Sequence, residues 1–192
     1  DDSIPIPVLE AYAGHGPLTV LQLDAHIDWR DEIHGERLGL SSNMRRASEL
    51  GFVERIVQVG QRGIGSARPA DYADAKQWGV RFVAASELHA HGIAPVLESI
   101  PAGADVFVNF DVDALDPSIM PAVIGPVPGG VSFRQAASLY FGLAAKARIA
   151  GFSIVELASD KDATGLAALV AARIVTNILG LCARQQGPVA PW

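Results

Sequence analysis

The sequence has 192 residues, of which 49% are hydrophobic and 19% are charged, and its formal net charge is −6. This composition suits a single globular domain, residues 1–192, and the acidic balance without a basic tract argues against nucleic acid as a partner. The sequence contains no run of about 18 apolar residues, so it predicts no membrane span. The single cysteine, Cys182, excludes an internal disulfide framework and favours a reducing compartment such as the cytoplasm.

Short β-branched runs alternate along the chain with segments of helical periodicity. The runs are mostly continuously apolar, as expected for strands buried on both faces of a parallel sheet. We therefore predict an α/β fold with three α/β/α layers and a mostly parallel sheet. The predicted strands cover residues 19–24, 56–60, 80–84, 105–113 and 151–156, and the predicted helices cover 69–78, 86–98, 132–147 and 164–182. Ser132 and Gln135 are spaced as a capping box for the third helix.

Asp24, His26 and Asp28 occupy alternate positions directly after the apolar run 19-TVLQL-23. An extended backbone places residues two apart on the same face, so these three side chains would point the same way at the end of a strand. A strand-end turn is the plain alternative, because aspartate is common in turns.

A second pair of acidic residues, Asp111 and Asp113, follows the strand 105-DVFVNF-110 with the same spacing of two. Ionised carboxylates at the end of a buried strand are costly unless they are paired or bind a metal. A turn explains either cluster alone about as well as a site does. The two clusters together favour a site.

Carboxylates combined with one imidazole suit a hard or borderline divalent ion, Mn²⁺ or Mg²⁺ ahead of copper or an iron–sulfur centre. The carboxylates outnumber what one ion needs. Two ions about 3.5–4 Å apart would share some of them and hold a bridging hydroxide, which predicts a hydrolytic site.

The sequence resembles the ureohydrolases, the family of arginase and agmatinase, in three motifs over essentially its whole length. These are 24-DAHID-28, 109-NFDVDALDP-117 and the strand-end Glu156 in 151-GFSIVEL-157. The resemblance implies an arginase-like α/β/α fold, two Mn²⁺ ions per subunit, hydrolysis of a guanidino group to urea and an amine, and a homo-oligomer, either a trimer or a hexamer. It also implies further chain before residue 1, so early strands of the sheet are expected to be missing from this sequence.

Carried over to this sequence, the resemblance assigns the metal ligands one by one. Asp24 and Asp111 would bridge the two ions, Asp28 would complete one of them, and His26 and Asp113 would complete the other.

The resemblance also gives roles to residues around the metals. Glu156 would hold the guanidinium through a bidentate pair, and His34 would relay protons to the leaving amine, a task that suits a side chain titrating near neutrality. Trp29 is a candidate for the pocket wall. Arg30 is a candidate partner for a substrate carboxylate, although a solvent-facing Arg30 or a pair with Glu32 is the more common arrangement.

One ligand position departs from the family pattern. The family usually has Gly-Gly-Asp-His-Ser before the first motif, whereas this chain opens 1-DDS-3, so that Asp2 stands where the metal-binding histidine is expected. Asp2 can still ligate, but five aspartates would then face the four positive charges of two divalent ions. The additional anion should favour metal retention and a cationic substrate.

The substrate class that follows is agmatine or a guanidino acid such as guanidinobutyrate, because no arginase-type loop for an amino acid's α-carboxylate and α-amino groups is recognisable after Asp28. Two alternatives stay open. One is hydrolysis of a formimino group with release of formamide, and the other is a non-catalytic family member that acts in assembly or regulation.

Replacing Asp2 with histidine tests the charge argument. The additional anion should make metal-bound water less acidic, so the Asp2→His variant is expected to reach its maximal activity at a lower pH than the wild-type protein. A pH–rate profile of both proteins measures the difference, and superimposable profiles would contradict the argument.

Overall fold

The computed structural model describes residues 1–185, and the remaining part of the expected domain, 186–192, lies outside the described residues. Its centre is a five-stranded sheet in the order β3-β2-β1-β4-β5, in which every neighbouring pair is parallel. The strands are β1 (Leu18–Leu23), β2 (Val53–Val59), β3 (Arg81–Val83), β4 (Asp105–Asp111) and β5 (Arg148–Val155).

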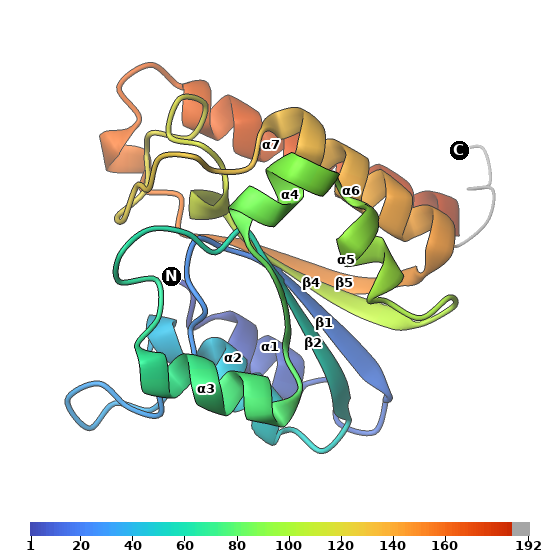
Figure 1. The fold of residues 1–192 in the computed structure, drawn as a ribbon. Helices are drawn as coiled ribbons and strands as arrows, with labels where there is room; N and C mark the ends of the chain where they lie inside the picture. The colour runs from blue at the N-terminus through green and yellow to red at the C-terminus, as the bar shows by residue number, and fades with distance from the viewer. Residues whose placement is uncertain (186–192) are drawn as a thin grey trace.

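Helices cover both faces of this sheet, which confirms the three-layer prediction (Figure 1). One layer contains α1 (Pro5–Glu10), α2 (Asn43–Glu49) and α3 (Pro69–Trp78). The other contains α4 (Ala85–His91), α5 (Ala94–Glu98), α6 (Phe133–Lys146) and α7 (Leu166–Gln185). Short 3-10 helices span Leu40–Ser42, Val112–Ala114 and Ser159–Lys161.

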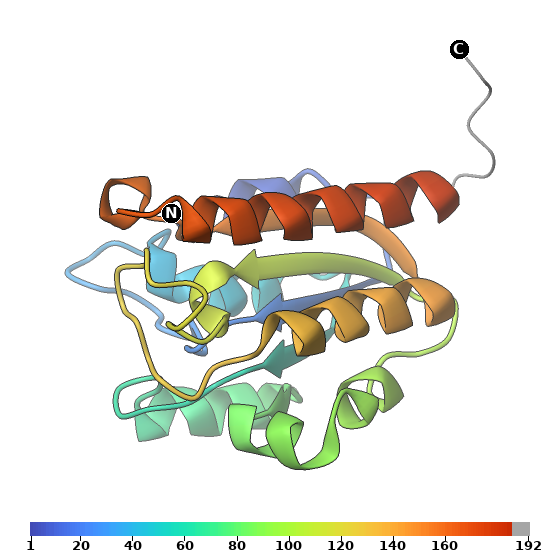
Figure 2. The same cartoon turned by 90° about the horizontal axis from the view of Figure 1, so that it is seen from above.

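Each face of the sheet has its own hydrophobic core. Phe110, Leu139 and Ile174 belong to the core under α4 to α7, whereas Met44 and Phe107 belong to the core under α1 to α3. All six residues of β1 are buried, which explains why its sequence reads as a continuous run instead of an alternating one. Figure 2 shows the strands running in one direction, so their carboxyl ends meet at one edge beside the N-terminus.

The capping box was predicted correctly: the hydroxyl of Ser132 accepts from the backbone N–H of Gln135, whose side chain accepts from the N–H of Ser132. The predicted helix 86–98 is instead two helices, because the chain takes a positive φ of +67° at Gly92. The strand predicted to reach residue 113 ends at Asp111. Helix α1 was not predicted, since a six-residue segment with two prolines gives little periodicity.

Within the described residues, α7 is long and apolar enough to cross a membrane by length and composition. A core helix of a globular protein meets the same criterion. In this fold α7 buries Ala171, Ile174 and Ile178 and packs against α6 and β5, so it forms part of the helical layer over the sheet.

Candidate metal centre

Five aspartates gather at the carboxyl edge of the sheet. Asp24 follows β1, Asp111 ends β4, and Asp113 lies in the 3-10 helix that continues β4. Asp2 and Asp28 join them, and all five are no more than 8% exposed. The backbone of β2 can pass close to Asp24 because its next residue is glycine: a Cβ at Gly60 would lie 2.9 Å from the Asp24 carbonyl oxygen. Strand order therefore assembles residues that are far apart in sequence.

Four of these aspartates, all except Asp24, line a cavity of about 210 Å³ together with Glu156. Its lining residues are Asp2, His26, Asp28, Leu40, Ser41, Asp111, Asp113, Ile124, Gly125 and Glu156. Asp28 and Glu156 have φ values of +46° and +65°. This left-handed conformation is costly for residues other than glycine and clusters at functional sites.

Two groups of three side chains have ligand atoms within 4.8 Å of one another. One group is Asp24, His26 and Asp113, and the other is Asp2, Asp24 and Asp111. Asp24 belongs to both groups, so it stands between two positions that could each hold an ion. Asp28 lines the same cavity and hydrogen-bonds to the amides of Gln22 and Asn43.

Burial raises the pKa of Asp2, Asp24, Asp28 and Asp111 well above the usual value of 3.8. Repulsion adds to this effect: Asp111 and Asp113 raise the pKa of Asp24, and Asp24 raises that of Asp28. A cluster of this kind is unfavourable as a set of bare anions, and a bound cation would relieve both burial and repulsion.

Asp113 differs from its neighbours. Burial opposes its ionisation, but the hydrogen bond from His26 and the imidazolium charge lower its pKa below 3.8. His26 Nδ1 lies 3.1 Å from Asp113 Oδ2 and 3.3 Å from Asp24 Oδ1, and the bond to Asp113 is the main cause of its raised pKa. Among the described residues that line the cavity, only His26 can carry a positive charge. The donor set therefore fits divalent cations.

Glu156 lies across the cavity at the end of β5, where Oε1 accepts a hydrogen bond of 2.8 Å from the Asp2 backbone N–H. Leu40 and Ile124 also line the cavity, and they are 44% and 67% exposed. The cavity is thus lined by acidic side chains together with two exposed apolar ones.

The structure places three of the predicted residues away from this cavity or at its border. Trp29 packs against Trp78, and its indole N–H donates to Asp74 at 2.6 Å; it is buried and does not line the acidic cavity. His34 is exposed, with a φ of +53°, in the turn between Ile33 and Glu36. The loop between β1 and α2 protrudes from the molecule in Figure 1. Arg30 is half-buried and lines a separate cavity of about 50 Å³ with His26 and Asp28.

Sequence reasoning missed several polar residues that support the site. Gln22, Asn43 and Asn109 donate side-chain N–H groups to the aspartates. The signal was present, because Gln22 and Asn109 are polar residues inside runs that are otherwise apolar. The stretch 60-GQRGIG-65 reads as a turn, but the guanidinium of its Arg62 donates to the carbonyls of Asp113, Ala114, Leu115 and Val127. It holds the loop that carries Asp113.

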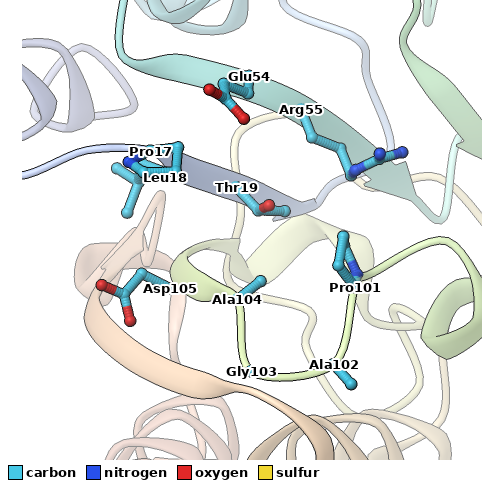
Figure 3. Close-up of a pocket in the computed structure, with 10 residues that line it drawn as sticks. All are labelled: Pro17, Leu18, Thr19, Glu54, Arg55, Pro101, Ala102, Gly103, Ala104 and Asp105. Atoms are coloured by element: carbon cyan, nitrogen blue, oxygen red, sulfur yellow. The ribbon is translucent and has the colours of Figure 1, made fainter.

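A larger cavity, of about 400 Å³, lies at the opposite edge of the sheet (Figure 3). It is lined by the first residues of β1 and β4, by residues of β2 and by the loop 101–104. Asp105 there is paired with Arg148, which leaves Glu54 and Arg55 as its charged lining. In parallel α/β sheets ligands bind beyond the carboxyl ends of the strands, so the smaller acidic cavity is the functional candidate.

Comparison with known proteins shows the family to which the chain belongs. Residues 1–180 match the model of the Arginase family. The chain is 33% identical over 186 residues to the mitochondrial arginase 1 of Arabidopsis thaliana and 34% identical over 191 residues to the N(1)-aminopropylagmatine ureohydrolase of Thermus thermophilus. These alignments cover 93% and 97% of this chain but 52% and 62% of the relatives, so the chain spans little more than half of their length.

A solved structure shares the same arrangement. Proclavaminate amidino hydrolase from Streptomyces clavuligerus superimposes with a TM-score of 0.86 at 29% identity, over 96% of this chain and 62% of that one. The parallel α/β sheet described above is therefore an arginase-like fold.

The raised pKa values predict how the metal-free protein responds to pH. The pKa values of four carboxyl groups are higher in the folded protein than in the unfolded one; these are Asp2, Asp24, Asp28 and Asp111. Their contribution to the free energy of unfolding is fully present below about pH 4 and is lost as the pH rises through their folded pKa values. The pKa of Asp113 is lowered, so this group alone would make the free energy of unfolding rise with pH, and the four other carboxyl groups outweigh it. The free energy of unfolding should therefore fall as the pH is raised from about 4 to 7 without metal.

Denaturant unfolding of the metal-stripped, full-length protein across this pH range checks the prediction. Mn²⁺ at 100 times its dissociation constant should add about 2.7 kcal/mol per ion to the free energy of unfolding near neutral pH. Asp111→Asn removes one repelling charge, so the free energy of unfolding of this variant should fall less with pH in the absence of metal. Metal-free stability that increases with pH would contradict the assigned electrostatics.

Proposed function

Because the chain belongs to the arginase family, we propose that it carries the catalytic centre of a metal-dependent hydrolase that cleaves a linear guanidino compound into urea and an amine. The observation that carries this proposal is the pair of three-residue groups that share Asp24 at the edge of the sheet. Two adjoining cation positions beside an acidic cavity suit the hydrolysis of a cationic substrate.

The chain's own side chains divide into ion holders and substrate holders. Asp24 would be shared between two ions, with Asp2 and Asp111 on one side and His26 and Asp113 on the other; Asp28 would complete the set. We propose Mn²⁺, which suits carboxylate and imidazole ligands. When bound, the ions would lower the pKa of a water molecule so that it is available as hydroxide near neutral pH.

Glu156 is proposed to bind the guanidinium. Its carboxylate lines the cavity and already accepts one N–H, and a carboxylate can take two parallel N–H groups from a planar guanidinium. Water adds to the guanidinium carbon, the bond from that carbon to the alkyl-bearing nitrogen breaks, and this nitrogen takes a proton as it leaves. For His34 to supply that proton, the exposed loop that carries it must fold over the cavity.

The residues that line the cavity indicate which class of substrate it would bind. Leu40 and Ile124 offer apolar surface for a methylene chain, and the acidic lining favours a positively charged head. We propose agmatine or a guanidino acid such as guanidinobutyrate as the substrate class. Arg30, half-buried beside Asp28, is the proposed partner of a tail carboxylate if the substrate is an acid.

We also propose that the protein is a cytoplasmic homo-oligomer, a trimer or a hexamer. Leu169 and Leu179 on α7 and Phe141 on α6 are 48–54% exposed, which provides apolar surface for contact with another subunit. Cys182, half-buried and unpaired among the described residues, accords with a reducing compartment.

Urea release by the full-length, Mn²⁺-loaded protein tests the function. The substrates are agmatine, guanidinobutyrate, guanidinopropionate and arginine, and one of them should yield urea. Glu156→Ala should lower kcat/KM by a factor that corresponds to about 2–5 kcal/mol of transition-state binding. The reason is that the guanidinium of the substrate would lose its charged partner in the cavity. Asp160→Ala, which changes an exposed acid on the loop after β5, is the matched control and should keep full activity.

The other outcomes separate the alternatives. Formamide released from a formimino substrate, without urea, would replace the proposed reaction by its formimino counterpart. Absence of any product from a protein shown to contain both ions would support the non-catalytic role and contradict the proposal.

A further inference from the structure

Four polar side chains lie in one row across the sheet, directly beneath the aspartates. The register pairs Gln58 of β2 with Gln22 of β1, Gln22 with Asn109 of β4, and Asn109 with Ser153 of β5. Paired residues of in-register parallel strands point to the same face, so these four, which we call the amide row, form one continuous band. Gln58, Gln22 and Asn109 are completely buried, in strands that also contribute Leu18, Val20, Ile56 and Phe107 to the hydrophobic core.

The first half of the amide row supports the first cluster of aspartates. The side-chain N–H₂ of Gln22 donates to Asp24 Oδ2 at 2.7 Å and to Asp28 Oδ2 at 3.0 Å. Its oxygen accepts from the N–H₂ of Gln58. Both N–H groups of Gln22 are therefore directed at carboxylates, and its oxygen is turned away from them.

The second half has the same polarity. Asn109 donates its side-chain N–H to Asp2 Oδ1 at 3.1 Å, and its oxygen accepts from the hydroxyl of Ser153 at 2.7 Å. In both halves the residue on the outer strand donates to the amide on the inner strand, and the inner amide donates to a carboxylate.

A backbone carbonyl fixes this polarity. Gln58 also donates to the carbonyl oxygen of Ile27 at 2.8 Å, and a carbonyl can only accept. The Gln58 amide must therefore point its N–H₂ towards Ile27 and Gln22. Its own oxygen is buried without a hydrogen-bond partner among the described residues. An unpaired buried oxygen is unfavourable, and Gln58 carries it while its N–H₂ group serves both Gln22 and Ile27.

We propose that the amide row is a positioning layer that orients Asp2, Asp24 and Asp28 and thereby sets the affinity of the site for divalent ions. This inference rests on the proposed function. Gln22 holds Oδ2 of both Asp24 and Asp28, and Asn109 holds Oδ1 of Asp2. Asn43 also donates to Oδ2 of Asp2, so the amides fix the orientation of these carboxylates. Amides suit this task because they are neutral: an arginine or lysine in their place would hold the carboxylates but compete with the cation. Partners of this kind commonly change metal affinity about 10–100-fold when they are removed.

The outer residues, Gln58 and Ser153, provide the sharpest test, because their side-chain hydrogen bonds in the described structure go to Gln22, Ile27 and Asn109 and not to the aspartates. Mn²⁺ affinity is measured by titration calorimetry on metal-stripped, full-length protein. Gln58→Leu and Ser153→Ala are each expected to weaken Mn²⁺ binding by about 10-fold or more. Ser153→Thr keeps the hydroxyl and should keep the wild-type affinity.

Gln185→Leu is the matched control for loss of a structural amide. Gln185, at the end of α7, donates to the carbonyls of Ala144 and Ala147 and accepts from the N–H of Ile149. Ile149 lies near the start of β5, whereas the aspartates lie at the other ends of the strands. This variant should unfold more easily and bind Mn²⁺ as tightly as the wild-type protein.

The outcomes are distinguishable. Wild-type affinity in folded Gln58→Leu and Ser153→Ala, with stability reduced as in Gln185→Leu, would overturn the positioning role and leave the proposed function intact. No Mn²⁺ binding by the wild-type protein would overturn the proposed function and this inference with it. If Gln58→Leu does not fold, the comparison of Ser153→Ala with Ser153→Thr decides the question.

Discussion

The mutual repulsion of five buried aspartates is the constraint on which the rest of this structure depends. Parallel strand order brings Asp24, Asp111 and Asp113 to one edge, where they are almost completely buried. Burial and repulsion raise the pKa of most of these groups, so the arrangement is favourable only when positive charge is supplied. His26 supplies part of that charge, and bound divalent ions would supply the rest. The proposed metal centre is therefore a consequence of where the carboxylates lie.

Holding such a cluster in place requires partners that do not neutralise it. The amides of Gln22, Asn43 and Asn109 donate to the carboxylates without adding charge. Arg62 acts at a greater distance, because it donates to backbone carbonyls of the loop that carries Asp113 and to none of the carboxylates described here. Asp116 anchors the same region by accepting from the N–H groups of Gly129 and Gly130, and hydrogen bonds lower its pKa to about 2. Neutral amides thus hold the carboxylates, whereas the charged side chains of Arg62 and Asp116 hold the backbone around them.

The sequence predicted the parts of the fold that depend on local pattern. Continuous apolar runs indicated a buried parallel sheet, and Ser132 with Gln135 marked the start of α6. The same runs placed Asp24 and Asp111 at strand ends. The location of Trp29 outside the acidic cavity was not predictable, because Trp29 follows the left-handed backbone of Asp28, and a positive φ for a non-glycine residue has no sequence signature. The amide row was also missed, since it appears only when the register of four strands is known.

The number of ions bound per chain tests the central claim most directly. Titration of the metal-stripped, full-length protein with Mn²⁺, checked by elemental analysis after dialysis, should give two ions per chain in the wild-type protein. Because Asp24 belongs to both ligand groups, Asp24→Asn should weaken both sites together, whereas Asp111→Asn should mainly weaken one. A single ion in the wild-type protein, or loss of only one ion in Asp24→Asn, would contradict a two-ion centre built around Asp24.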